Sequence, residues 1–327
     1  MPTAAPSYLD PATIASVGSI DLRARMIVEG LMTGMHRSPM QGFSVEFAQH
    51  RQYTPGDDTR FLDWKVFGRT DKLYLKQHQK ETNLDLVVMV DCSGSMAYSS
   101  PLVRQRLGSD WRKFDHAATL GAVVSHLALK QQDRVQVVLF DEDVVARTRV
   151  SNASAHWREV VQTLERAPLP DPASALRSVS ATDDDARGRT SLSRTFDRVL
   201  SRLTQRSLLL LVSDLMDDPA AIDRALARAH HRRHDVMIVQ ALDPAEREFP
   251  FRAPSEFVGL ESEGRLPINP ESLKRAYLET MNAHLRETDE AARRFQFDLL
   301  RIDTTDPVGP PLSHFLAKRA SAISKRS

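Results

Sequence analysis

Asp91, Ser93 and Ser95 place oxygen-bearing side chains at alternate positions of one short segment. They follow residues 84–90, a nearly continuous apolar run that has the length and valine content of a strand buried on both faces. Gly94 permits a turn tight enough to bring the two serine hydroxyls around one point. Mg²⁺ prefers near-octahedral oxygen ligands at about 2.1 Å, so the spacing predicts a site for Mg²⁺ or Mn²⁺. The alternative is a polar loop that only caps the next helix.

A metal bound by this segment would favour a further ligand from outside the chain. Serine hydroxyls are neutral, so few charges would offset the ion. An open coordination position could then be filled by a carboxylate from a binding partner. The segment therefore predicts metal-dependent binding of an acidic side chain.

Two phosphatase chemistries do not fit the same segment. Aspartate-based phosphatases carry a second carboxylate two residues after the nucleophile, where this chain has Ser93. A cysteine phosphatase loop needs an arginine six residues after its cysteine, and six residues after Cys92 is Tyr98. The sequence also contains no phosphate-binding loop, dinucleotide fingerprint or serine-nucleophile elbow. Cys92 is therefore interpreted as a small residue that faces inward.

Apolar strands alternate with amphipathic helices along the chain. This rhythm predicts an α/β fold with a doubly wound, mostly parallel, Rossmann-like sheet and helices on both faces. The strand at 207–212 delivers Ser213 and Asp214 at its carboxyl end, where open α/β sheets bind ligands. The expected strands are residues 43–47, 74–76, 84–90, 134–140, an antiparallel edge at 144–150, 207–212, 236–240 and 297–302, with a hairpin at 256–268. The expected helices are residues 111–130, 156–166, 190–203, 219–230, 270–294 and 313–319, with polar loops at 99–109 and 167–189.

The chain divides into an amino-terminal extension, residues 1–80, and a sheet domain, residues 81–327. Residues 1–18 contain three prolines among small residues and are expected to be loosely attached. Apolar residues at helical spacing predict a helix over residues 20–32. Residues 51–64 combine dense charges with aromatic rings, and we interpret them as a loop that fastens the extension onto the sheet domain.

Composition limits the possible partners. Across 327 residues, 44 Lys and Arg against 43 Asp and Glu give a formal net charge of +1, so no overall field attracts nucleic acid or an anionic membrane. No apolar run approaches the ~20 residues that span a bilayer, and the amino terminus carries no secretory signal. His230, His231 and His234 could suggest zinc or nucleic acid, but they stand at a predicted helix carboxyl end, where the dipole favours cations. We expect a cytoplasmic protein that neither spans a membrane nor binds nucleic acid.

The candidate ligands resemble the metal-ion-dependent adhesion site of von Willebrand factor A-like domains. The resemblance rests on Asp91, Ser93 and Ser95 after a buried first strand, a threonine before a later helix, and Ser213-Asp214 at the end of the next strand. It implies that the two serines and the threonine ligate Mg²⁺ directly. Asp91 and Asp214 would act mainly through water.

The resemblance assigns the third hydroxyl to Thr190. The family often has a second glycine in this loop, where the present chain has Arg189. Ser191 or Thr195 could therefore take the role instead.

An upstream pattern is similar to the bacterial family known as domain of unknown function 58. The residues that carry the similarity are Gly34-x-His36-Arg37-Ser38-Pro39, Gly42-Phe43, Phe47 and Arg51-x-Tyr53-x-Pro55-Gly56-Asp57-Asp58-x-Arg60-x-x-Asp63-Trp64. The similarity runs from about residue 34 to the end of the chain. It implies a von Willebrand factor A-like protein that acts with a MoxR-type AAA+ ATPase in chaperone-like maturation or assembly of other proteins.

These observations predict a Mg²⁺-dependent protein-binding module that is not an enzyme. Its partner would be the MoxR-type ATPase or a client, held through an acidic residue. The alternative is a metal-dependent phosphoesterase, which needs a general base or nucleophile beside the metal. No such group is evident apart from Asp91 and Asp214.

Overall fold

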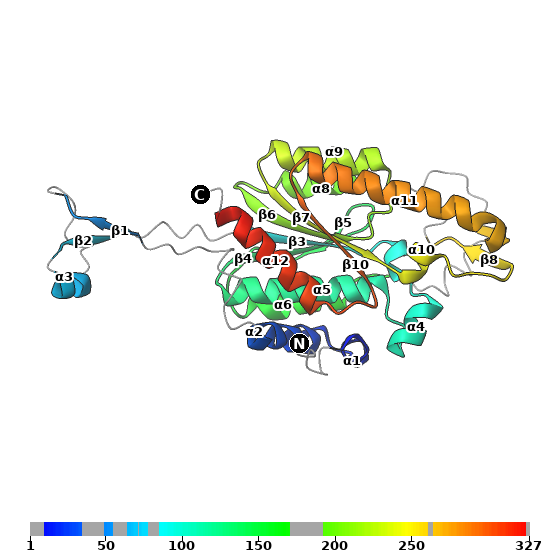
Figure 1. The fold of residues 1–327 in the computed structure, drawn as a ribbon, viewed down its shortest axis with the longest axis horizontal. Helices are drawn as coiled ribbons and strands as arrows, with labels where there is room; N and C mark the ends of the chain where they lie inside the picture. The colour runs from blue at the N-terminus through cyan, green and yellow to red at the C-terminus, as the bar shows by residue number, and fades with distance from the viewer. Residues whose placement is uncertain are drawn as a thin grey trace.

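The computed structural model describes residues 10–34, 49–54, 64–70, 72–77, 85–170, 192–260 and 264–324. In chain order the elements are α1 (Pro11–Ser16), α2 (Ile20–Gly34), β1 (Gln49–Gln52), α3 (Trp64–Thr70), β2 (Tyr74–Gln77), β3 (Asp85–Asp91), a 3₁₀ turn (Gly94–Ala97), α4 (Pro101–Leu107), α5 (Lys113–Lys130), β4 (Arg134–Phe140), β5 (Val144–Arg147), α6 (His156–Glu165), α8 (Leu192–Leu200), β6 (Ser207–Ser213), α9 (Pro219–His231), β7 (Asp235–Leu242), α10 (Pro244–Glu248), β8 (Ser255–Val258), β9 (Arg265–Ile268), α11 (Pro270–Arg294), β10 (Asp298–Asp303) and α12 (Gly309–Ser324). Figure 1 shows how they are arranged.

A six-stranded sheet forms the centre of the molecule, with the strand order β10-β7-β6-β3-β4-β5. Its pairings are parallel except that of β4 with β5, which is antiparallel. Counted along the chain from β3, the order across the sheet is 3-2-1-4-5-6, so the direction of winding reverses between β3 and β6. The predicted doubly wound, mostly parallel sheet is therefore confirmed, including its antiparallel edge.

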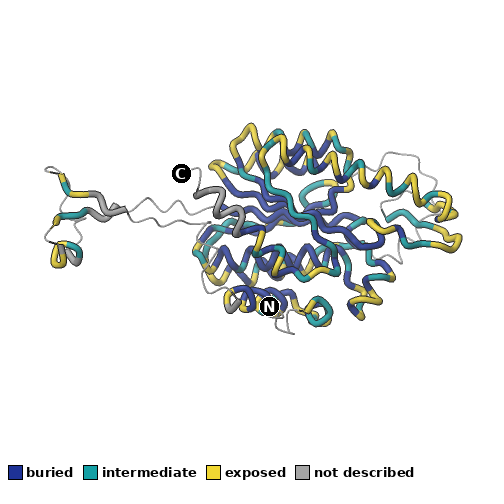
Figure 2. Tube along the Cα trace, viewed as in Figure 1, coloured by how far each residue is buried: buried dark blue, intermediate teal, exposed yellow. Residues whose placement is uncertain are grey.

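Different helices cover the two faces of this sheet. α5, α6 and α12 lie on one face, with α2 packed outside them, and α8, α9 and α11 lie on the other (Figure 1). Side chains alternate along β3, so Leu86, Val88 and Val90 join the first core cluster while Val87 and Met89 join the second. All residues of β3 are buried, and Figure 2 shows the same for the middle of the sheet. The prediction of a strand buried on both faces is confirmed.

The amino-terminal helices contribute to the core of the sheet domain. Ile27 and Val28 of α2 are at most 2% exposed, and α2 packs against α5. The expectation that residues 1–18 are loosely attached is wrong for α1. The side chain of Asp10 caps this helix, and Ile14 is 4% exposed within the same core cluster.

α4 and α12 also differ from the sequence prediction. The expected polar loop at 99–109 contains α4, which Ser100 caps by accepting from the backbone of Val103 and which Gly108 ends at a φ of 71°. α12 begins at Gly309 rather than near residue 313. Prolines in its first turn hide this start in the sequence, although a first turn tolerates them.

β1 and β2 form an antiparallel pair separate from the main sheet (blue in Figure 1), which confirms the strand expected at 74–76. The hairpin β8–β9 and the helix α11 are also confirmed. The strand expected at 43–47 and residues 55–63 lie outside the described residues, as does the proposed domain boundary between residues 80 and 81. The fastening role of residues 51–64 therefore stays a prediction.

Candidate functional site

The predicted ligands meet where the winding of the sheet reverses. β3 and β6 are parallel neighbours with Val90 opposite Val212, so both strands end at the same edge. Asp91 closes β3, and Ser213 closes β6 directly before Asp214. Open α/β sheets bind ligands at this position, outside the carboxyl ends of the strands where the strand order reverses.

A small cavity opens at this edge of the sheet. Its volume of about 20 Å³ is enough for a single ion or water molecule. The lining residues are Asp91, Ser93, Ser95, Leu192, Ser213, Asp214, Leu215, Met216 and Asp217. Four of the five predicted ligands therefore share one cavity.

Asp91 is held from two sides and is only 2% exposed. One carboxylate oxygen accepts from the backbone N–H of Ser93 at 2.9 Å, and the other accepts from the hydroxyl of Ser213 at 2.5 Å. Burial, together with the nearby charge of Asp214, raises the pKa of Asp91 to about 7. A cation in the cavity would favour the charged form of this carboxylate.

The two serine hydroxyls lie side by side, with 3.1 Å between Ser93 Oγ and Ser95 Oγ. Adjacent ligands of an octahedral Mg²⁺, each about 2.1 Å from the ion, are about 3.0 Å apart. The hydroxyls are therefore spaced as neighbours in such a shell. Ser93 precedes the 3₁₀ turn but makes no side-chain capping hydrogen bond, which argues against the alternative of a loop that only caps a helix.

Asp214 is 2% exposed, and its carboxylate accepts three hydrogen bonds. It accepts from the N–H of Met216 at 3.2 Å, from the ammonium of Lys113 at 2.7 Å and from the hydroxyl of Ser95. Burial raises the pKa of Asp214, but the charge of Lys113 and the hydrogen bonds to the carboxylate together lower the pKa below its ordinary value. The side-chain amide of Gln240 donates to the backbone carbonyl of Asp214 at 2.9 Å. Asp214 is thus ionised and fixed in place.

Lys113 was not expected from the sequence. It begins α5, its side chain is 0% exposed, and its ammonium lies 2.7 Å from Asp214 and 2.5 Å from Glu246. Burial lowers the pKa of Lys113, but the two carboxylates raise it above its ordinary value on balance. Lys113 shares the buried face of α5 with Ala117 and Leu120, at helical spacing. That position is the signal in the sequence, because a lysine on a buried face needs buried partners.

The third hydroxyl ligand stays a prediction, because Thr190 and Ser191 lie outside the described residues. Thr195 is buried in α8 and does not line the cavity. Leu192 lies there instead, and its backbone N–H donates to the carboxylate of Asp217 at 2.9 Å. The structure therefore does not bring Thr195 to the site.

The loop after β6 forms one rim of the cavity. Leu215 is buried at a positive φ of 55°, whereas Met216 is 40% exposed. The N–H of Leu215 donates to Ser213 Oγ at 2.9 Å, and its carbonyl is 2.7 Å from the ring nitrogen Nε2 of His284 on α11. A positive φ at a non-glycine residue persists only where the surroundings determine it. The loop is thus held in shape by the protein alone.

Other candidate sites in the sequence have structural roles. Within the described residues, no three or more His, Cys, Asp or Glu side chains gather as a metal site. Cys92 faces inward as predicted, with its thiol donating to the carbonyl of Phe140 at 3.2 Å. His230 packs against Phe295, and Nδ1 of the buried His234 accepts from a backbone N–H of β6. None of the described helices is long and apolar enough to cross a membrane.

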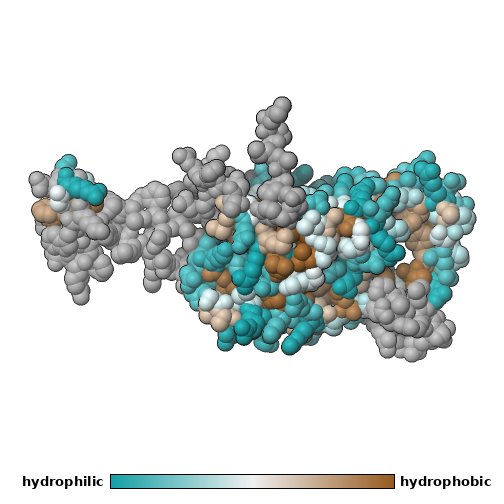
Figure 3. All heavy atoms as spheres, turned by 90° about the horizontal axis from the view of Figure 1, so that it is seen from below, coloured by the Kyte–Doolittle hydropathy of each residue, from teal (hydrophilic) through white to brown (hydrophobic). Residues whose placement is uncertain are grey.

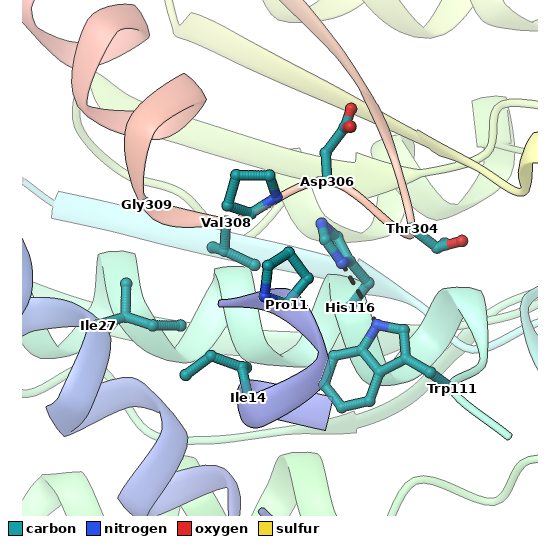
Figure 4. A pocket seen from close by; sticks show the side chains of 10 residues that line it. Pro11, Ile14, Ile27, Trp111, His116, Thr304, Asp306, Val308 and Gly309 are labelled. Atoms are coloured by element: carbon teal, nitrogen blue, oxygen red, sulfur yellow. Dashed lines mark hydrogen bonds between the residues drawn. The ribbon is translucent and has the colours of Figure 1, made fainter. Parts of the chain in front are cut away.

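A second cavity of about 10 Å³ lies between α1, α5 and the segment before α12 (Figure 4). Nε1 of Trp111 donates to Nδ1 of His116 at 3.4 Å beside it. Burial lowers the pKa of His116 to about 4. The cavity admits one water molecule at most, so we interpret it as a gap in packing.

Comparison with known proteins identifies relatives of undefined function. The chain is 24% identical over 241 residues to the uncharacterized protein Rv1480 of Mycobacterium tuberculosis (strain ATCC 25618 / H37Rv), a match that covers 74% of this chain and 68% of the relative. Among solved structures it is similar to the conserved hypothetical protein BatB from Bacteroides thetaiotaomicron, with 12% identity, a TM-score of 0.44 and coverage of 73% of this chain and 99% of BatB. An aerotolerance-related membrane protein from Bacteroides fragilis NCTC 9343 gives 12% identity and a TM-score of 0.45 over 73% of this chain and 99% of the other. Scores this low carry no information on function.

The family comparison covers the candidate site. Residues 49–288 match the family described as "Protein of unknown function DUF58". The matched range contains the residues that line the cavity, and also Lys113 and Glu246. Because the match extends over most of the chain, this protein belongs to the DUF58 family.

Proposed function

We propose that this protein is a non-enzymatic, cytoplasmic protein-binding module whose site holds Mg²⁺ or Mn²⁺. The observation that carries the proposal is the pair of serine hydroxyls 3.1 Å apart, beside two buried carboxylates at the reversal point of the sheet. Ser93 and Ser95 would ligate the ion directly, with Thr190 as the third hydroxyl. Asp91 and Asp214 would orient the water molecules of the ion.

The partner is expected to offer an acidic side chain. A bound divalent ion supplies a point of positive charge at the mouth of the cavity. Ser93 and Ser95 add no negative charge, and Asp214 already accepts from the ammonium of Lys113. An aspartate or glutamate of the partner would complete the coordination, and the exposed Met216 would contact the residues beside it.

The ionisable groups near the cavity favour binding over hydrolysis. A phosphoesterase needs a side chain that is free to activate water or to attack the substrate. In the described part of the chain, Lys113 is engaged by two carboxylates and His284 by the carbonyl of Leu215. Asp217 accepts from the backbone N–H groups of Leu192 and Asp218. The binding module is therefore preferred to the metal-dependent phosphoesterase.

The family resemblance suggests what this partner is. We infer that the site engages a MoxR-type AAA+ ATPase or its client during chaperone-like maturation or assembly of other proteins. The formal net charge of +1 gives no reason to expect nucleic acid instead.

Co-purification from the native cell tests the proposed function. The tagged wild-type chain should retain its partner in Mg²⁺ and lose it in EDTA, because the ion bridges the two proteins. Asp91→Ala should lose the partner in both buffers. Asp223→Ala is a matched control, since it removes a carboxylate that pairs with Arg294 and does not line the cavity. Equal retention of the partner in EDTA, in Mg²⁺ and with Asp91→Ala would contradict the proposal.

A further inference from the structure

A fixed positive charge lies directly behind one carboxylate of the cavity. Lys113 Nζ donates to Asp214 Oδ2 at 2.7 Å and to Glu246 Oε1 at 2.5 Å, and its side chain has no exposed surface. Asp214 lines the cavity, whereas Lys113 and Glu246 do not. The ammonium is therefore separated from the cavity by a single carboxylate.

Neighbouring residues prevent this ammonium from leaving. The backbone of Lys113 belongs to the first turn of α5, and its N–H donates to the carbonyl of Tyr98 at 3.0 Å. Glu246 is fixed in turn, because its other carboxylate oxygen accepts from the N–H of Asp243 at 2.8 Å. The hydroxyl of Tyr277 donates to the backbone carbonyl of Glu246 at 3.0 Å. The position of the charge is thus set by the fold.

Such a charge opposes a cation in the cavity. Like charges repel, and the repulsion between buried groups is stronger than between groups in water. Asp214 also cannot offer its full negative charge to an ion while one of its oxygens accepts from an ammonium. The carboxylate of Asp214 would therefore be shared between the permanent charge of Lys113 and an exchangeable metal ion.

We propose that Lys113 sets the affinity of the cation site. Its ammonium weakens binding of the divalent ion, so the ion is held firmly only when a partner adds another negative charge. This inference rests on the proposed function and deepens it, because it identifies the residue that makes ion binding and partner binding interdependent.

Glu246 should affect ion binding in the opposite direction to Lys113. Its carboxylate shares the ammonium with Asp214, so it reduces the effect of Lys113 on the cavity. Glu246→Gln leaves the ammonium paired with Asp214 alone and should weaken ion binding. Lys113→Met combined with Glu246→Gln removes both buried charges, frees Asp214 for the ion and should strengthen binding.

Titration calorimetry of the full chain with MgCl₂ measures these effects. We expect the Kd for Mg²⁺ to fall about tenfold in the double variant and to rise about threefold in Glu246→Gln, as charges at this range allow. Lys130→Met is the matched control, because it is the same substitution at the exposed other end of α5, about 25 Å away at 1.5 Å per residue. Its Kd should equal that of the wild type. Circular dichroism establishes that each variant is folded.

The outcomes separate this inference from the proposed function. Equal Kd values in the wild type and in every variant would overturn the inference, leaving the proposed function intact and Lys113 an anchor of α5. A wild type and variants that bind neither Mg²⁺ nor Mn²⁺ would overturn both. If the double variant does not fold, Glu246→Gln decides alone: weaker binding supports the inference, and unchanged or tighter binding overturns it.

Discussion

Ser93 and Ser95 differ from most serines at a strand end, because their hydroxyls face each other across 3.1 Å. A serine in such a position usually accepts from the backbone of the next turn. Ser93 does not, and the hydroxyl of Ser95 instead contacts Asp214. The two serines thus line the cavity, and their hydroxyls contribute little to the stability of the turn.

Replacement of both hydroxyls therefore separates ion binding from folding. Ser93→Ala with Ser95→Ala should abolish Mg²⁺ binding in calorimetry, while the melting temperature stays close to that of the wild type. Ser201→Ala removes an exposed hydroxyl that donates to the backbone carbonyl of Arg198 in α8, and this variant should bind Mg²⁺ normally. A double variant that binds Mg²⁺ as tightly as the wild type would place the ion elsewhere.

Helices and strands are easiest to predict from the sequence where they are long and carry a clear residue pattern. β4 spans the predicted residues because an apolar run of strand length has few alternatives, and α11 carries a start signal in Asn269 and Pro270. α1 and α4 have only six and seven residues, too few for a helical period to be visible. Their stability depends on local caps and on contacts with distant elements, such as the burial of Ile14 in the main core.

The residues of the candidate site also differ in whether the sequence could bring them together. Asp91 and Asp214 could be placed together from the sequence, since both follow strands of one parallel sheet. Lys113 could not, because it begins a helix and does not follow a strand of the sheet. Its contact with Asp214 and Glu246 depends on how α5 and α10 pack at the edge of the sheet, which no local pattern records.

Docking of α1 can be tested through its one buried residue. Ile14→Ala should lower the free energy of unfolding by roughly 2–4 kcal/mol, because the large-to-small change leaves a cavity in the core. Urea denaturation measures this. Ser16→Ala in the same helix is exposed and should change the free energy by less than about 0.5 kcal/mol. An unchanged stability in Ile14→Ala would mean that residues 1–18 are loosely attached after all.

For the molecule as a whole, two buried groups influence stability at acid pH in opposite directions. Burial lowers the pKa of His116 from 6.5 to about 4, so its contribution is complete above pH 6.5 and is lost as the pH falls toward 4. Burial and Asp214 raise the pKa of Asp91 from 3.8 to about 7, so its contribution is complete below pH 3.8 and is lost as the pH rises through 7. The two contributions to the free energy of unfolding have opposite pH dependence and cancel in part. The pH dependence of the total is therefore smaller than that of either group alone.

Substitution of His116 isolates the part of the pH dependence of stability that comes from this histidine. The difference in the free energy of unfolding between the wild type and His116→Gln should change by about 3 kcal/mol between pH 7 and pH 4, in favour of the variant at the lower pH. Urea denaturation at both values measures it. His231→Gln, at an exposed position, should keep the pH dependence of the wild type. A constant difference between wild type and His116→Gln would exclude His116 as the group responsible.

On the face drawn in Figure 3, hydrophobic residues gather near the middle, with hydrophilic ones around them. In the proposed function, a partner is held by a localised contact at the cation site. The exposed Met216 is the large apolar side chain of the cavity rim that such a contact would cover.

The loop after β6 is ordered by the protein itself, through Gln240 of β7, His284 of α11 and the left-handed conformation of Leu215. In kinetic terms, binding of an ion in the cavity would not require this loop to rearrange. At the proposed Mg²⁺ site, the slow step would then be the loss of water from the ion, which Mg²⁺ releases reluctantly. The lifetime of a complex formed through the ion would follow the exchange of ligands on the metal rather than the motion of the chain.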